Sequence, residues 1–175
     1  MTGRAAQIAE TVQLVVLDVD GVLTDGTLLY GGDQDGEIKA FNIKDGLGIK
    51  LLQHAGIPVA IITGRTSQAV QRRAAELGIE MSVQGRADKG AALCELLDSV
   101  NLSPSAVAYM GDDLPDISAL KLVGLATCPS DAAKAVLDIA DWVSPCAGGC
   151  GAVRALSEFI LESQGKLREA VERYQ

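Results

Sequence analysis

An apolar run that ends in two carboxylates constrains the fold of this chain more than any other feature. Residues 12–17 are almost entirely aliphatic, and the sequence Asp-Val-Asp-Gly follows at once at 18–21. Because apolar residues stand side by side in the run, we expect a strand buried on both faces, as in a parallel sheet. Open α/β sheets bind ligands at the carboxyl ends of their strands. Strand alternation would place Asp18 and Asp20 on one side, so their mutual repulsion implies a bound cation, acid/base chemistry, or both.

Length and composition favour a single domain with an aliphatic core. The chain has 175 residues, of which 48% are hydrophobic and only 3% aromatic. At this length about 70% of the unfolded surface is buried on folding, and a core of Val, Ile, Leu and Ala suits a parallel sheet between helices. The net charge of −8 argues against nucleic-acid binding, which needs a basic face.

No apolar run reaches the roughly 20 residues of a membrane span, and residues 1–11 lack the pattern of a signal peptide. We therefore expect a cytoplasmic protein with no membrane partner and with reduced thiols. The cysteines lack the two close pairs of a typical zinc site, so we expect no metal at Cys94, Cys128, Cys146 or Cys150.

Short apolar strands alternate with amphipathic helices, which predicts a three-layer, Rossmann-like α/β fold with a parallel sheet and flanking helices. The expected strands are 12–18, 59–63, 81–83, 107–111, 124–126 and 142–143. The expected helices are 46–55, 67–77, 89–100, 115–120, 131–137 and 153–164, with N-caps at Asp45, Ser67, Asp88 and Asp131. A β-hairpin of residues 27–43 interrupts the rhythm, and a flexible glycine-rich tail with a helix fills 144–175. We expect one domain over 1–175, without a separate cap domain.

Polar residues follow four of the expected strands, at the edge where the carboxyl ends of parallel strands meet. They are Asp18 and Asp20, Thr63 to Arg65, Asp88 and Lys89, and Asp112, Asp113 and Asp116. Each group is a weak signal alone, because acids, lysines and Thr-Gly-Arg turns are common at helix starts. In this order, each at a strand end, they predict one converging site.

This set of residue types suits phosphoryl transfer. Asp18 would attack phosphorus and form an aspartyl-phosphate, while Asp20 would protonate the leaving alkoxide and then activate water. Asp112, Asp18 and the carbonyl of Asp20 would hold Mg²⁺ through hard oxygen ligands.

Donors and cations would surround the phosphate. Thr63 Oγ1 and the Gly64 N–H would bind its oxygens, and Lys89 would offset the charge that builds during transfer. Asp113 and Asp116 would hold Lys89 or the waters of the metal.

In these motifs and their order the chain resembles the haloacid dehalogenase phosphatase superfamily. More narrowly, it is similar to the family of 3-deoxy-manno-octulosonate 8-phosphate (KDO 8-phosphate) phosphatases of lipopolysaccharide sugar synthesis, from Leu14 to about Leu167. The segments that carry the similarity are 18–26 (DVDGVLTDG), 41–48 (FNIKDGLG), 60–65 (AIITGR), 88–89 (DK), 111–114 (GDDL) and 148–154 (GGCGAVR).

This resemblance implies Mg²⁺-dependent hydrolysis of KDO 8-phosphate to KDO and phosphate through an aspartyl-phosphate, in a homotetramer. It also implies contacts to the sugar from Asn42, Ile43, Lys44, Asp45 and Gly46, and from Lys50, Arg65 and Arg73. The chain departs from the family pattern at Lys50 and Cys150, where arginine is expected. Both departures bear on the choice of sugar more than on the reaction.

The gaps between the motifs leave no room for a lid domain, and an uncovered site would be open to water. We therefore expect a homo-oligomer built through the hairpin, with segment 148–151 as a second candidate cover. Two alternatives remain open. One is a phosphatase for a nine-carbon 2-keto-sugar acid 9-phosphate. The other is a phospho-acceptor signalling domain, which also gathers Asp, Thr and Lys at strand ends, although Lys89 here precedes the second acidic cluster.

Overall fold

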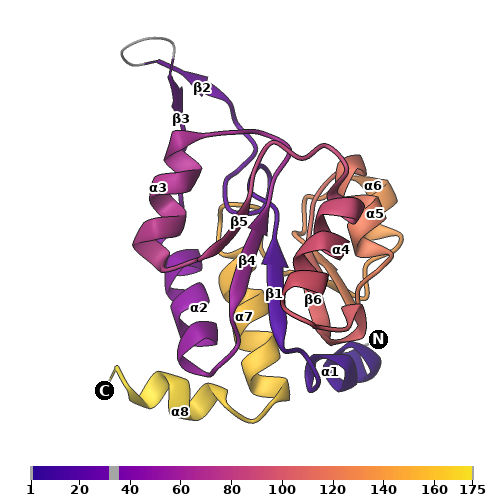
Figure 1. Ribbon diagram of the computed structural model, residues 1–175. Helices are drawn as coiled ribbons and strands as arrows, with labels where there is room; N and C mark the ends of the chain where they lie inside the picture. The colour runs from indigo at the N-terminus through magenta and orange to yellow at the C-terminus, as the bar shows by residue number, and fades with distance from the viewer. Residues whose placement is uncertain (1, 32–35, 175) are drawn as a thin grey trace.

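The computed structural model describes residues 2–31 and 36–174, and a six-stranded parallel sheet forms its centre (Figure 1). The strand order is β5-β4-β1-β6-β7-β8. The strands are β1 (Leu14–Leu17), β4 (Val59–Ile62), β5 (Met81–Val83), β6 (Val107–Met110), β7 (Leu125–Cys128) and β8 (Trp142–Val143). The chain builds outward from β1 in one direction and then returns to build from β6 in the other, so the order reverses between β1 and β6. Ligands bind outside the carboxyl ends of strands at such a reversal.

Helices cover both faces of the sheet, which confirms the predicted three-layer Rossmann-like fold (Figure 1). The alternation of β1 explains the layers, because Val15 and Leu17 belong to one apolar cluster and Leu14 and Val16 to the other. The first cluster includes residues of α1 (Thr2–Ala9), α2 (Ile43–His54), α3 (Gln68–Leu77), α7 (Ala152–Ser163) and α8 (Leu167–Glu172). The second includes residues of α4 (Lys89–Ser99), α5 (Ile117–Leu120) and α6 (Lys134–Leu137). Two 3₁₀ turns, η1 (Pro104–Ala106) and η2 (Leu114–Asp116), complete the elements.

The predicted hairpin is present and projects from the body of the molecule (Figure 1). It pairs β2 (Leu29–Tyr30) with β3 (Glu37–Ile38) in antiparallel register. The turn that joins them, residues 32–35, lies outside the described residues. Within the described ranges, no helix combines the length and the apolar character that a membrane crossing requires.

Two of the four predicted N-caps are wrong. Helix α2 begins at Ile43, because Asn42 caps it by accepting the Lys44 N–H at 2.8 Å, so Asp45 lies inside the first turn. Asp131 does not cap α6, and its carboxylate instead accepts the N–H of Gly148 at 3.0 Å. The Ser67 and Asp88 positions are right: each precedes its helix, and Asp88 accepts the N–H of Ala91 at 3.0 Å. Short polar side chains are common at helix ends, but tertiary contacts with backbone N–H groups hold Asp45 and Asp131 elsewhere.

Candidate active site

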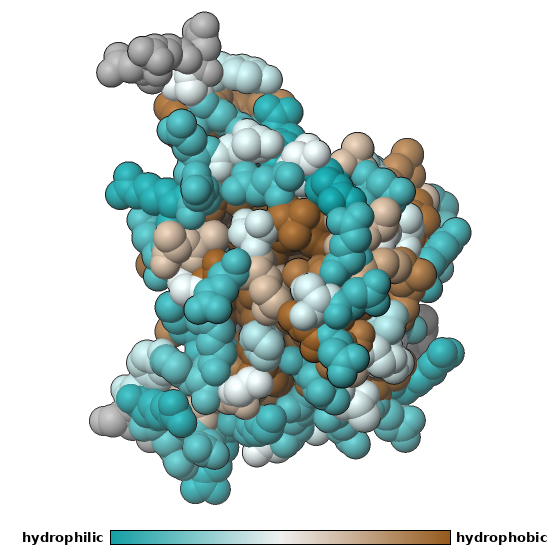
Figure 2. All heavy atoms as spheres, viewed as in Figure 1, coloured by the Kyte–Doolittle hydropathy of each residue, from teal (hydrophilic) through white to brown (hydrophobic). Residues whose placement is uncertain are grey.

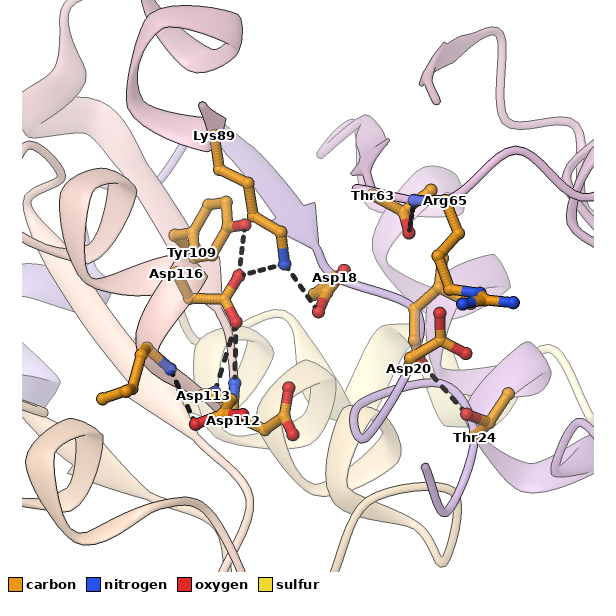
Figure 3. A network of polar contacts seen from close by, with 12 residues as sticks. Asp18, Asp20, Thr24, Thr63, Arg65, Lys89, Tyr109, Asp112, Asp113 and Asp116 are labelled. Carbon is orange, nitrogen blue, oxygen red and sulfur yellow. Dashed lines mark hydrogen bonds and ion pairs between the residues drawn. The ribbon is translucent and has the colours of Figure 1, made fainter. Parts of the chain in front are cut away.

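The predicted strand-end residues converge on one cleft at the carboxyl edge of the sheet, beside the reversal between β1 and β6 (Figure 3). Asp18 follows β1, Thr63 follows β4, and Lys89 begins α4. Of the residues assigned to catalysis, metal or phosphate by sequence, those lining this cleft are Asp18, Asp20, Thr63, Gly64, Arg65, Lys89, Asp112, Asp113 and Asp116. The crossovers of a parallel sheet therefore bring together residues that are nearly 100 positions apart in the chain.

Lys89 is the centre of a buried polar network. Its Nζ lies 2.7 Å from Asp18 Oδ2 and 2.7 Å from Asp116 Oδ1. Asp116 also accepts the hydroxyl of Tyr109 at 2.7 Å on Oδ1, and the backbone N–H groups of Asp112 and Asp113 at 3.2 and 3.3 Å on Oδ2. Four donors thus hold Asp116, whose side chain is fully buried. Burial favours the neutral form of Lys89, but the two carboxylates outweigh it and hold the pKa of Lys89 above its ordinary value.

The acidic residues of the cleft suit a divalent cation. Carboxylate oxygens of Asp18, Asp112 and Asp116 lie within 4.8 Å of one another. Burial, with the nearby charge of Asp116 as the second cause, raises the pKa of both Asp18 and Asp112 to about 7. Because four donors occupy Asp116, the ligands that remain are Asp18 and Asp112. A cation between them would relieve both buried charges, and hard carboxylate oxygens are what Mg²⁺ prefers. Among the described residues, the group does not include the carboxylate of Asp20, and a metal contact through the backbone carbonyl of Asp20 stays a prediction.

The carboxylate of Asp20 contacts Lys39, a residue that the sequence analysis missed. Lys39 Nζ pairs with Asp20 and lies 2.8 Å from Glu37 Oε1, and Arg65 Nε approaches the same oxygen at 3.4 Å. The Lys39 side chain is only 1% exposed. Burial alone would lower the pKa of Lys39, but the hydrogen bonds and charges of the two carboxylates raise it. This chain of ion pairs fastens the base of the hairpin to the loop that carries Asp18 and Asp20. A signal existed in the sequence, since alternation places Glu37 and Lys39 on one side of an extended segment.

The structure contradicts the predicted sugar contact of Asp45. Its side chain is buried, with 1% of the residue exposed, and it accepts the N–H of Gly151 at 3.2 Å and that of Arg154 at 2.8 Å. Asp45 therefore caps the beginning of α7 rather than facing a ligand. Asn42 also points to this region, donating its side-chain amide to the carbonyl of Gly149 at 3.1 Å.

Among the other residues predicted to contact the sugar, Lys50 lies apart from the rest. Lys50 donates to the carbonyl of Leu77 at 2.6 Å, at the end of α3 and the amino-terminal edge of the sheet, so the prediction that it binds the sugar is wrong for the site of its own chain. Arg73 lies over the ring of Phe41, with 5.8 Å from its Cζ to the ring centroid, beside the hairpin base. Ile43 is 82% exposed at the start of α2. Lys44 is exposed there too, and Gly46 adjoins the Arg73 guanidinium.

The glycine-rich segment, predicted to be flexible, is packed against the loop of its own chain that follows β1. The Gly149 N–H donates to the carbonyl of Val22 at 2.9 Å. A Cβ atom built on Gly148 would lie 1.9 Å from the backbone oxygen of Gly21, which only a glycine permits. Cys150, where the family pattern expects arginine, is exposed and follows this contact. The segment therefore braces the loop that carries Asp18 and Asp20.

Comparisons with known proteins agree with this geometry. The profile described as haloacid dehalogenase-like hydrolase matches residues 41–124. The 3-deoxy-D-manno-octulosonate 8-phosphate phosphatase KdsC of Escherichia coli K12 is 46% identical over 162 residues, which cover 93% of this chain and 86% of the relative. The KdsC of Yersinia pestis is 45% identical over 164 residues, which cover 94% and 87%.

Solved structures show the same relationship. The 3-deoxy-D-manno-octulosonate 8-phosphate phosphatase of Moraxella catarrhalis, crystallised with magnesium ion, phosphate ion and KDO, matches with a TM-score of 0.96 and 38% identity, over 100% of both chains. The cobalt-bound enzyme of Haemophilus influenzae matches with a TM-score of 0.88 and 40% identity, over 92% of this chain and 94% of that one. The fold, the site and these relatives show that the chain belongs to the KdsC family of haloacid dehalogenase-like hydrolases.

Proposed function

We propose that this protein is a Mg²⁺-dependent phosphatase that hydrolyses 3-deoxy-D-manno-octulosonate 8-phosphate to KDO and phosphate, in lipopolysaccharide sugar synthesis. The observation that carries the proposal is the buried Asp18–Lys89 pair, at 2.7 Å, beside Asp112 at the reversal of the sheet. This arrangement supports the roles of Asp18 as carboxylate nucleophile, of Lys89 as counter-charge and of Asp112 as cation ligand around one point. The relatives that share the fold over nearly the whole chain are phosphatases of this substrate.

In the first half of the reaction, a carboxylate oxygen of Asp18 attacks phosphorus. The O–P bond to Asp18 forms as the bond from phosphorus to the sugar oxygen breaks, and Asp20 gives that oxygen its proton. Lys89 and Thr63, which line the cleft, stabilise the charge on the phosphoryl oxygens. Mg²⁺ held by Asp18 and Asp112 would supply the positive charge that lets a carboxylate approach a phosphate dianion.

In the second half, water attacks the aspartyl-phosphate. Asp20, now ionised, takes a proton from the water as the new O–P bond forms, and the bond from phosphorus to Asp18 breaks. Phosphate leaves, and both carboxylates return to their starting states. Asp113, as cap of η2, and Asp116, as the anchor of Lys89, hold the surroundings in place.

The test is phosphate release from KDO 8-phosphate with Mg²⁺ by the wild type, Asp18→Asn and Asp20→Asn. We expect no turnover with Asp18→Asn and nearly none with Asp20→Asn, with folding kept. Asp138→Asn, which alters an exposed ion pair with Lys134, is the matched control and should keep full activity.

Other substrates and a non-enzymatic role are distinguished in the same experiment. A higher kcat/KM on a nine-carbon 2-keto-sugar acid 9-phosphate would reassign the substrate, and equal rates on simple hexose phosphates would argue against any sugar acid. A long-lived phosphoryl group on Asp18 without multiple turnovers would instead indicate a phospho-acceptor signalling domain. Substantial residual activity in Asp18→Asn would refute its role as nucleophile.

We also propose that the protein is a homo-oligomer, a tetramer, built through the hairpin. Large apolar side chains are exposed there: Leu28 (40%), Leu29 (47%), Tyr30 (73%) and Ile38 (51%). Figure 2 shows hydrophobic atoms on the projecting hairpin, where a second copy would cover them. Light scattering should give a tetramer for the wild type and smaller species for Ile38→Asp. A wild-type monomer with full activity at the assay concentration would refute this proposal.

Two further assignments complete the proposal. The apolar clusters on the two faces share one sheet, which supports a single phosphatase domain over residues 1–175. All four cysteines are free thiols, which supports a reducing compartment and hence the cytoplasm. Cell fractionation tests this location, and a native protein that co-fractionates with a periplasmic marker would contradict it.

A further inference from the structure

Tyr109 is a polar exception in an aliphatic core. It lies on β6, one of the two strands paired with β1, and is fully buried in the cluster beneath α4 and α5. The chain has only three tyrosines. A buried phenol hydroxyl costs free energy unless it finds a partner, and a phenylalanine would fill the same space without that cost. The hydroxyl therefore serves its partner, which is Asp116 at 2.7 Å.

Asp116 is held in one place by contacts on all sides. Its Oδ1 accepts both Tyr109 and Lys89, and its Oδ2 accepts two backbone N–H groups. The backbone also approaches it closely, since a Cβ built on Gly111 would lie 2.4 Å from the Cβ of Asp116. Figure 3 shows the tyrosine hydroxyl and the lysine ammonium meeting at the same carboxylate, with Asp18 beyond the lysine.

Lys89 is shared between two carboxylates, each at 2.7 Å from its Nζ. Asp116 and Asp18 compete for the same ammonium group. A second donor on the Oδ1 atom of Asp116 takes up part of its negative charge and reduces its pull on Lys89. Without that donor, the ammonium would shift toward Asp116 and away from Asp18, where the phosphoryl group reacts.

We propose that Tyr109 is a positioning residue, whose hydroxyl acts through Asp116 to hold Lys89 at the phosphoryl group. The inference rests on the proposed phosphatase function. Because the network touches the phosphoryl group and not the sugar, loss of the hydroxyl lowers kcat and leaves KM nearly unchanged. Removal of one hydrogen bond to a charged group should lower kcat about tenfold.

The experiment compares the wild type with Tyr109→Phe on two substrates, KDO 8-phosphate and para-nitrophenyl phosphate, at saturating Mg²⁺. We expect kcat to fall about tenfold on both, with KM within about twofold of the wild type. Thr127→Val is the matched control. It removes another buried hydrogen bond of Tyr109, donated by Thr127 Oγ1 on the neighbouring strand β7 to the backbone oxygen of Tyr109 at 2.9 Å, without touching the hydroxyl. Its melting temperature should fall as much as that of Tyr109→Phe, while its kcat stays at the wild-type value.

Three outcomes overturn the inference. The first is a wild-type kcat in Tyr109→Phe. The second is a loss confined to the sugar-acid substrate or to KM, which would indicate a sugar contact. The third is an equal loss of kcat in Thr127→Val, which would indicate general loosening of the strand. A wild-type protein that releases no phosphate from either substrate refutes the proposed function instead, so the two failures are distinct.

Discussion

Replacing Asp45 by alanine tests whether this residue holds the fold together or binds the sugar. The carboxylate is the N-terminal cap of α7 and accepts two backbone N–H groups, from Gly151 and Arg154. Alanine removes both acceptors and leaves the donors without partners inside the protein. Helix α7 packs on α2 and contributes Val153, Leu156 and Ile160 to the core, so the loss at its first turn reaches the whole domain.

The magnitude follows from the two bonds. Each backbone donor that is left unpaired costs about 1–3 kcal/mol where it is buried. Part of this is offset, because burial raises the pKa of Asp45 and alanine removes that cost of burying a carboxylate. A net loss of about 2–3 kcal/mol remains. In a protein of this length it lowers the melting temperature by about 5–10 °C.

Thermal and urea unfolding of Asp45→Ala, with steady-state kinetics on the same preparation, provide the measurement. Asp88→Ala is the control, since Asp88 caps α4 through a single exposed bond to Ala91 and should cost only about 1 kcal/mol. An unchanged melting temperature with a KM raised tenfold would refute the reasoning and return Asp45 to the role of sugar ligand.

Three further results are expected. In protein freed of metal by a chelator, the free energy of unfolding should fall as pH rises from about 4 to 7. The reason is that the pKa values of Asp18 and Asp112 are raised to about 7, so the folded state holds protons that the unfolded chain releases near pH 4. Added Mg²⁺ should restore stability most at the upper end of that range, and melting curves measure both effects. Gly148→Ala should cost about 2 kcal/mol or more and lower kcat, because its methyl group would lie 1.9 Å from the backbone oxygen of Gly21; unfolding and kinetics measure both. Lys50→Met should keep kcat and KM while lowering the unfolding free energy by about 1 kcal/mol, because the lysine caps the end of α3.

Each of these three predictions has its own control or its own contradicting result. Gly3→Ala, at a glycine of α1 with open space around it, should keep the wild-type kcat and lose no stability. Metal-free stability that increases toward pH 7 would contradict the protonation argument. Wild-type kcat in Gly148→Ala would mean that the segment does not brace the catalytic loop. A raised KM in Lys50→Met would restore its predicted contact with the sugar.

The residues that line the cleft were predictable because local pattern and topology act together on them. A strand buried on both faces, as 14–17 is, commits the chain to a parallel sheet, and right-handed crossovers then send each strand end to the same edge. The positions of Asp18, Thr63, Lys89 and Asp112 follow from that rule without any knowledge of side-chain packing.

The residues on α2 were less predictable, because that helix is covered on several sides. Gly46 adjoins the guanidinium of Arg73, and a Cβ on Gly48 would lie 2.9 Å from the Cα of Arg154. Such close approaches turn polar side chains toward neighbouring elements rather than toward solvent or ligand. Asp45 therefore caps α7 and Lys50 caps α3, although the family resemblance implied that both contact the sugar.

The sequence by itself determined the layered fold, the edge that holds the site and the order of residues around it, because strand burial and alternation are local properties. Only the tertiary structure decided which polar groups face one another. Tyr109 reads as a core aromatic and Lys39 as a hairpin charge until packing brings them to Asp116 and Asp20. Pairing of polar groups inside a low-dielectric interior depends on distances of a few ångströms between side chains that are far apart in the chain. The hydrophobic periodicity of the sequence does not specify those distances.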